Sequence, residues 1–250
     1  MRKIFIYATL IILCAACESE SEVAASRANV SFNFSHSWHG EMITKNDLNT
    51  IKFRNENGEL LSIERLRYLI SNITFTTSNN EILVLSGYNL VDFVNEENLI
   101  FIPSGTIPSG NYSNVSFTFG FNNEDNYNNY PDLNSASWSV PAQLGGGYHY
   151  MQLEGRFIDN TSTETGYAYH AIRAVDNSGA ELQFQDTFFK VNLGAVEITN
   201  NTIINVEMDV AEWFKNPNTW DLNVLNTTLM PNFEAQIDMF ENGQSVFNLK

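Results

Sequence analysis

Cysteine is almost absent from this 250-residue chain: its two cysteines, Cys14 and Cys17, both lie within the first 17 residues. A domain that follows them can contain neither a disulfide nor a thiolate metal site, so it must be held together by its core. Histidine is scarce too, and any imidazole chemistry must come from four residues. These are His36, His39, His149 and His170.

Basic residues are also few, with 13 lysines and arginines against 29 aspartates and glutamates. Removal of residues 1–16 would take away Arg2 and Lys3, leaving 11 basic against 29 acidic side chains and a net charge of −18. A surface of this sign is a poor partner for nucleic acid or anionic lipid headgroups.

Sequence motifs of catalysis are missing. The chain has no Gly-x-Ser-x-Gly and no His-Glu-x-x-His, and the glycines at 145–147 lack the lysine and Ser/Thr of a phosphate-binding loop. Glu124, Asp125 and Asp132 could bind Ca²⁺, but they lack EF-hand spacing, and a solvated loop over 122–134 is the simpler interpretation. A hydrolase with scattered carboxylates stays open, because the separation of two carboxylates depends on the fold. We expect no enzymatic activity.

The first 17 residues have the pattern of a bacterial lipoprotein signal peptide. Arg2 and Lys3 precede an apolar run over 4–13 that is too short to span a bilayer stably. Ala15-Ala16-Cys17 resembles a lipobox, with Cys14 where leucine is usual. We therefore expect a lipid on Cys17 and an outer-membrane lipoprotein of the cell envelope. Ordinary cleavage, giving a free periplasmic protein, is the alternative.

An acidic segment, ESESE at 18–22, directly follows this signal. It resembles the export tag of Bacteroidota lipoproteins displayed on the cell surface, or it is a solvated tether. We predict a flexible tether over 18–28 and a single domain over 29–250, attached to the membrane only through its lipid.

Alternating apolar residues run through most of the predicted domain. The segments NVSFNFSHSW (29–38), NYSNVSFTFGF (111–121) and NTIINVEMDV (201–210) are typical strands, with Asn, Gly and Ser between such runs. Asp209 and Glu212 have capping-box spacing and Pro217 follows, which predicts one short helix at 210–215. The fold class predicted is all-β: an antiparallel β-sandwich with one short helix near the C-terminal part.

Three of the four histidines fall on the predicted apolar face of a strand. His36 alternates with Phe34 and Trp38, His149 with Met151, and His170 with Ala168 and Ile172, while His39 falls on the opposite face. Each one alone is most simply a hydrogen-bonded core histidine. Three neutral imidazoles near a thioether, with no cysteine, suit copper, and zinc is the alternative.

Several segments and one tryptophan resemble the MbnP-like copper-binding domain, in the version found in Bacteroidota lipoproteins. They are RLRYLISNITF, LVDF, FTFGFNNEDN, Trp138, GGGYHYMQLEGRF, GYAYHAIR and MDVAEWFKNP, and the resemblance covers about residues 29–249. It implies a β-sandwich in which two histidines hold copper with an oxidised tryptophan, kynurenine, placed two residues before a histidine.

In this chain His36-Ser37-Trp38 has that spacing in reverse order. The resemblance carries the metal ligands to His149 and His170, with His36 as the third. Trp38 and Met151 are the accessory residues. We therefore predict that the three histidines converge on one copper ion.

The predicted function is a non-enzymatic, extracytoplasmic copper-binding lipoprotein that sequesters or delivers copper. The alternative is a surface module in which Tyr148, Tyr150 and Tyr169 point outward and bind a carbohydrate or a partner protein, while the histidines are structural.

Overall fold

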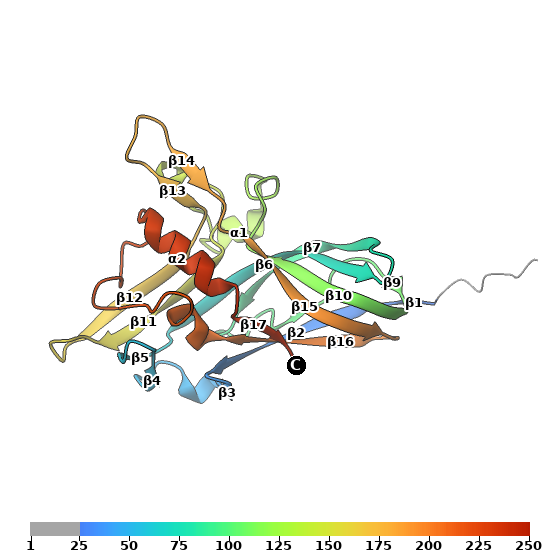
Figure 1. Ribbon diagram of the computed structural model, residues 1–250, viewed down its shortest axis with the longest axis horizontal. Helices are drawn as coiled ribbons and strands as arrows, with labels where there is room; N and C mark the ends of the chain where they lie inside the picture. Colours follow the sequence, from blue (N-terminus) through green and yellow to red (C-terminus); the bar gives the residue numbers. More distant parts are fainter. Residues whose placement is uncertain (1–25) are drawn as a thin grey trace, which may run out of the picture.

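The computed structural model describes residues 26–250 (Figure 1). The predicted signal peptide, Cys17 and the acidic segment at 18–22 lie outside these residues. Regular structure begins at β1 (Arg27–Ala28), two residues before the predicted start of the domain.

Eight antiparallel strands form the larger of two main sheets, in the order β15-β10-β6-β11-β5-β4, with β7 beside β6 and β12 beside β11. They are β4 (Phe53–Arg54), β5 (Leu60–Leu61), β6 (Arg65–Thr77), β7 (Ile82–Asp92), β10 (Gly110–Phe119), β11 (Met151–Ile158), β12 (Glu164–Ala171) and β15 (Phe189–Ile198).

The smaller sheet has five strands in the order β17-β16-β2-β3, with β8 also beside β2. They are β2 (Val30–Trp38), β3 (Glu41–Met42), β8 (Ile100–Phe101), β16 (Thr202–Asp209) and β17 (Phe247–Leu249). Strands β2 and β16 run parallel, unlike the antiparallel pairing predicted, because the long intervening chain allows a crossover connection. The remaining strands of the described residues form two two-stranded sheets: β1 with β9 (Ile107–Pro108), and β13 (Ala174–Asp176) with β14 (Gln183–Gln185).

Helices are short and few in the described residues. They are η1 (Lys45–Asp47), α1 (Pro131–Ser135), η2 (Ala142–Leu144), η3 (Val210–Phe214) and α2 (Phe233–Gly243). The helix predicted at 210–215 is the 3₁₀ helix η3, and Asp209 caps it by accepting a hydrogen bond from the Ala211 N–H. No helix within residues 26–250 is long and apolar enough to cross a membrane.

Aromatic side chains from both main sheets fill the space between them, so the predicted β-sandwich is confirmed. Phe34 of β2 packs edge-on against Tyr68 of β6 and Phe117 of β10, with ring centres 6.0 and 6.2 Å apart. Figure 1 shows β2 and β16 below β6, β7 and β10 of the larger sheet. These large buried rings account for much of the apolar area that stabilises a core without disulfides.

The larger sheet carries a second apolar cluster on its outer face, to which α1 contributes Leu133. It consists of Leu69, Phe121, Leu133, Trp138 and Tyr148. Leu69 follows Tyr68 on β6, and successive side chains of a strand point to opposite faces. The outer face is therefore partly covered, and its polar residues lie in a sheltered environment.

Candidate metal site

His170 lies on this outer face of the larger sheet, not in the sandwich core as predicted. In the register of β12 and β11, His170 is opposite Gln152, while Tyr169 is opposite Leu153, and both Tyr169 and Leu153 are fully buried in the main core. The predicted direction is wrong because two large aromatic residues, Tyr167 and Tyr169, fill the core in place of the small alanines. His170 retains 17 % side-chain exposure.

His149 lies two residues before β11 begins at Met151, so its side chain does not follow the alternation of that strand. It was predicted to face the core beside Met151, and that prediction is wrong. The residue is only 4 % exposed, but its ring packs against Trp138 of the outer cluster, with ring centres 5.6 Å apart. The chain therefore brings His149 to the same face of the sheet as His170.

The hydrogen bonds of His149 fix its tautomer. Its backbone N–H and its ring Nδ1 both lie near the carbonyl oxygen of Trp138, at 3.0 and 2.9 Å. Because a carbonyl only accepts, Nδ1 carries the proton and Nε2 carries the lone pair. Nε2 is buried and has no hydrogen-bond partner. Burial lowers the pKa of His149 to about 4, so the ring is neutral at neutral pH.

His170 is oriented by a carboxylate. Its Nε2 donates to Oε1 of Glu154 at 2.8 Å, and Arg65 donates to the same oxygen at 2.7 Å. The hydrogen bond from His170, with a further contribution from Arg65, lowers the pKa of Glu154 and keeps it ionised. With Nε2 protonated, Nδ1 of a neutral His170 carries the lone pair. The two histidines thus offer opposite ring nitrogens.

The ring centres of the pair lie within the separation that two imidazoles bound to one metal ion can have. Their ring centres are 5.3 Å apart and their planes are inclined at 83°. An imidazole centre lies about 1.15 Å from its nitrogens, so two imidazoles at about 2.0 to 2.1 Å from one ion have centres at most about 6.4 Å apart. Histidines that bind metals usually donate their other N–H to a carbonyl or a carboxylate, as both do here. Over residues 26–250, no group of three or more His, Cys, Asp or Glu side chains could hold a metal.

His36 is not part of this pair, so the predicted convergence of three histidines is not found. It lies on β2 of the smaller sheet, inside the sandwich. Its ring centre is 4.1 Å from that of Phe93, with the planes tilted by 30°, and 5.7 Å from that of Tyr68, which it meets edge-on. The expected direction of His36 toward the core is correct. The three imidazoles do not meet because His149 and His170 lie on the opposite side of the larger sheet from His36.

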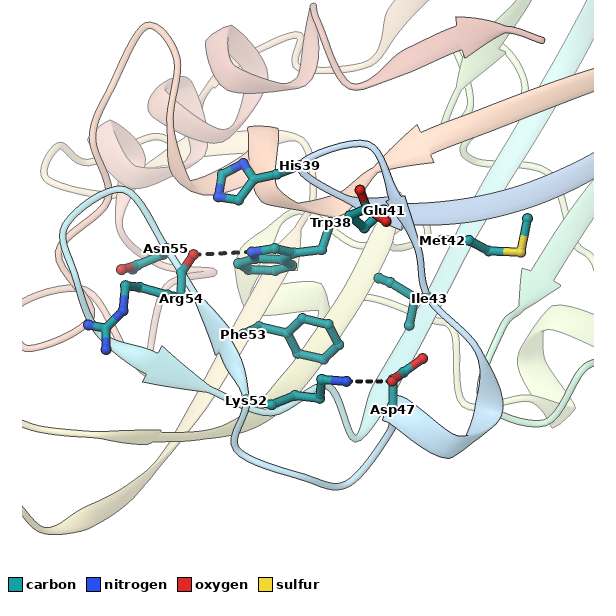
Figure 2. Close-up of a pocket in the computed structure, with 10 residues that line it drawn as sticks. All are labelled: Trp38, His39, Glu41, Met42, Ile43, Asp47, Lys52, Phe53, Arg54 and Asn55. Carbon is teal, nitrogen blue, oxygen red and sulfur yellow. Dashed lines mark hydrogen bonds and ion pairs between the residues drawn. The ribbon is translucent and has the colours of Figure 1, made fainter.

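The two accessory residues also lie elsewhere. Met151 is fully buried in the main core, one strand position from Gln152 on the outer face. Trp38 donates its indole N–H to the Arg54 carbonyl at 3.1 Å and packs against Phe53. Figure 2 shows Trp38 and His39 among the residues that line a pocket. The volume of this pocket is about 500 Å³. The tryptophan beside the histidine pair is Trp138.

No role in the site was predicted from the sequence for three residues beside the histidine pair: Trp138, Glu154 and Arg67. Arg67 of β6 lies over the Trp138 ring, 5.1 Å from its centre, and donates to the carbonyl of Ala136 and to Gln152. Trp138 is fully buried, and its indole N–H has no hydrogen-bond partner. Glu154 could have been identified from the sequence, because it lies on the polar face of its strand.

The tyrosines of the alternative surface module are buried, contrary to the prediction. Tyr150 and Tyr169 belong to the main core, and Tyr148 to the outer cluster. The Tyr148 hydroxyl accepts a hydrogen bond from the Tyr130 backbone and donates to Asn134. These residues form no exposed aromatic surface for a carbohydrate or a protein partner.

Fold and site together define a two-layer β protein with a sheltered histidine pair on the outer face of its larger sheet. The family model named MbnP matches residues 27–231, and the chain belongs to this family. The solved structure of MbnP from Methylosinus trichosporium is similar, with a TM-score of 0.54 and 13 % sequence identity over 78 % of this chain and 81 % of that one. At this identity the likeness concerns the fold alone. No curated protein matches the chain.

Proposed function

We propose that this protein binds copper between Nε2 of His149 and Nδ1 of His170, and that it sequesters or delivers the ion without catalysing a reaction. The observation that supports this most directly is the buried, unpartnered Nε2 of His149 beside a second histidine. An unsatisfied buried polar atom costs about 1 to 3 kcal/mol, and metal coordination removes that cost.

Cuprous copper suits these residues better than zinc does. Zinc sites in proteins almost always have three or four protein ligands, whereas this pair offers two neutral imidazoles and one nearby carboxylate already engaged by His170. Imidazole is a good ligand for copper, and the resemblance to a copper-binding domain supports the same metal.

We also propose that the protein acts in the cell envelope as an outer-membrane lipoprotein anchored through Cys17. The basic start, short apolar run and lipobox-like Ala15-Ala16-Cys17 support this. Metabolic labelling with a fatty acid, followed by membrane fractionation, tests it. Cys17→Ala should lose the label, and Ser21→Ala, which lies outside the lipobox-like segment, is the control that should keep it. Label on the Cys17→Ala protein would refute the anchor.

Anaerobic titration with Cu(I) against a colorimetric chelator tests the metal site. His149→Ala and His170→Ala should each lower the affinity by more than about 100-fold, because loss of an outer partner of a ligand alone costs 10- to 100-fold. His39→Ala removes an exposed histidine and should bind as the wild type does. Wild-type affinity in both test variants would overturn the proposal. Zn²⁺ in a parallel titration should bind more weakly; tighter Zn²⁺ binding would replace copper.

A further inference from the structure

A second pair of unpartnered nitrogens lies in the sandwich core, on His36. This residue is 2 % exposed, and neither Nδ1 nor Nε2 has a hydrogen-bond partner. The hydroxyl of Tyr68, whose ring is 5.7 Å from that of His36, also lacks a partner. More than nine in ten buried polar groups in proteins are satisfied, so three unsatisfied polar atoms in one part of a core need an explanation.

Soft and aromatic groups surround His36. Met208 is its register partner on the parallel strand β16, so both side chains point into the sandwich from strands about 4.8 Å apart. Met208 is fully buried. Phe93 packs against the imidazole at a tilt of 30°, and Met151 lies beside Tyr68 on the facing sheet. This part of the core thus combines an imidazole, two thioethers and two aromatic rings.

We infer that the sandwich core holds a second metal site, separate from the histidine pair, which takes a monovalent soft cation such as Cu(I) on one ring nitrogen of His36 and the thioether of Met208. Thioether ligands select Cu(I) over Zn²⁺ and over hard cations such as Ca²⁺ and Mg²⁺. A monovalent ion is also much less costly to bury than a divalent one, since solvation energy grows with the square of the charge.

Burial of His36 gives this second site a kinetic signature. An ion can reach a side chain that is 2 % exposed only when the sandwich opens locally. The core site should therefore bind and release Cu(I) more slowly than the histidine pair, where His170 is partly exposed.

The test uses the full chain with His149→Ala and His170→Ala combined, which removes the site of the proposed function. Anaerobic Cu(I) titration should show one slowly bound equivalent, and X-ray absorption should show a sulfur scatterer beside nitrogen. On this background His36→Phe should abolish binding, and Met208→Leu should remove the sulfur signal and weaken binding at least 10-fold. Met239→Leu removes another buried thioether, on α2, and is the matched control.

Loss of all Cu(I) binding in the double variant would overturn the core site, as would a bound ion with nitrogen and oxygen ligands only. Equal affinities of Met208→Leu and Met239→Leu would also overturn it and would favour a buried water between His36 and Tyr68. Leu and Met have similar volumes, so Met208→Leu decides the question even where His36→Phe fails to fold. The proposed function fails by a different result, namely wild-type copper binding when only the histidine pair is changed.

Discussion

Glu154 should control copper affinity although it does not contact the ion. Its carboxylate can only accept, so it holds His170 with Nε2 protonated and Nδ1 free for the metal. In Glu154→Gln the amide can donate as well as accept, so His170 is no longer held in one tautomer. The substitution keeps the shape of the side chain and removes the charge that fixes the ligand.

The size of the effect follows from the contacts that are lost. Glu154 accepts charge-assisted hydrogen bonds from Arg65 at 2.7 Å and, once His170 binds a metal, from an imidazole made more acidic by the ion. Removing such a partner of a metal ligand lowers metal affinity by 10- to 100-fold, or about 1.4 to 2.7 kcal/mol. The assay is the anaerobic Cu(I) competition titration. Nitrogen-15 NMR of the histidine side chains gives the second readout, because it distinguishes the coordinating nitrogen.

Glu164→Gln is the matched control. Glu164 lies on the adjoining strand β12 and pairs with Arg156 at 3.0 Å, but no histidine contacts it. This variant should change copper affinity less than twofold. If Glu154→Gln binds copper like Glu164→Gln, or if His170 in the wild type coordinates through Nε2, the assignment of Glu154 as the positioning residue is refuted.

Two further predictions concern stability. Burial lowers the pKa of His36 to about 3 and of His149 to about 4, so between these values and pH 6.5 the unfolded chain binds protons that the folded chain does not. The free energy of unfolding should therefore decrease by about 1.4 kcal/mol per histidine for each unit by which the pH is lowered. Urea unfolding at pH 7, 6 and 5 measures this slope, which His36→Phe should reduce by one histidine's share; an unchanged slope would contradict the burial of a neutral His36. Gly155→Ala should destabilise the protein by at least about 1 to 3 kcal/mol, since the new Cβ would lie 2.2 Å from the Ser62 carbonyl oxygen. Gly166→Ala is the control and should be tolerated, because its new Cβ would lie 3.9 Å from the nearest atom. Equal melting temperatures of the two glycine variants would contradict this packing argument.

The main architecture could be predicted because alternation is a local property of the sequence. Residues 30, 32, 34, 36 and 38 of β2 alternate with polar residues, and all five are buried in the structure. The helix η3 was predictable from the side-chain cap at Asp209. The helix α2 was missed because two of its buried residues, Gln236 and Asn242, are polar and weaken the apolar pattern. Both hydrogen-bond to backbone carbonyls of neighbouring segments, which only the folded structure reveals.

The site was harder to predict, because it depends on which face of each strand is the core face. For the segment GYAYHAIRAV, the small alanines share one face with His170 and the tyrosines share the other. Choosing the alanine face as the core placed His170 inside. A choice by side-chain volume would have placed Tyr167 and Tyr169 inside, since aromatic rings supply most of the buried area of a core. That choice would also have placed His170 beside Glu154.

The partner of His149 could not be predicted from strand alternation, because it depends on a reversal of the chain. Gly145, Gly146 and Gly147 all have positive φ angles, 92°, 70° and 78°, which glycine adopts without strain. This turn returns the chain so that the Trp138 carbonyl, eleven residues earlier, accepts both N–H groups of His149. The three glycines thereby place His149 so that Nδ1 donates to this carbonyl, and Nε2 is the nitrogen left for the proposed metal.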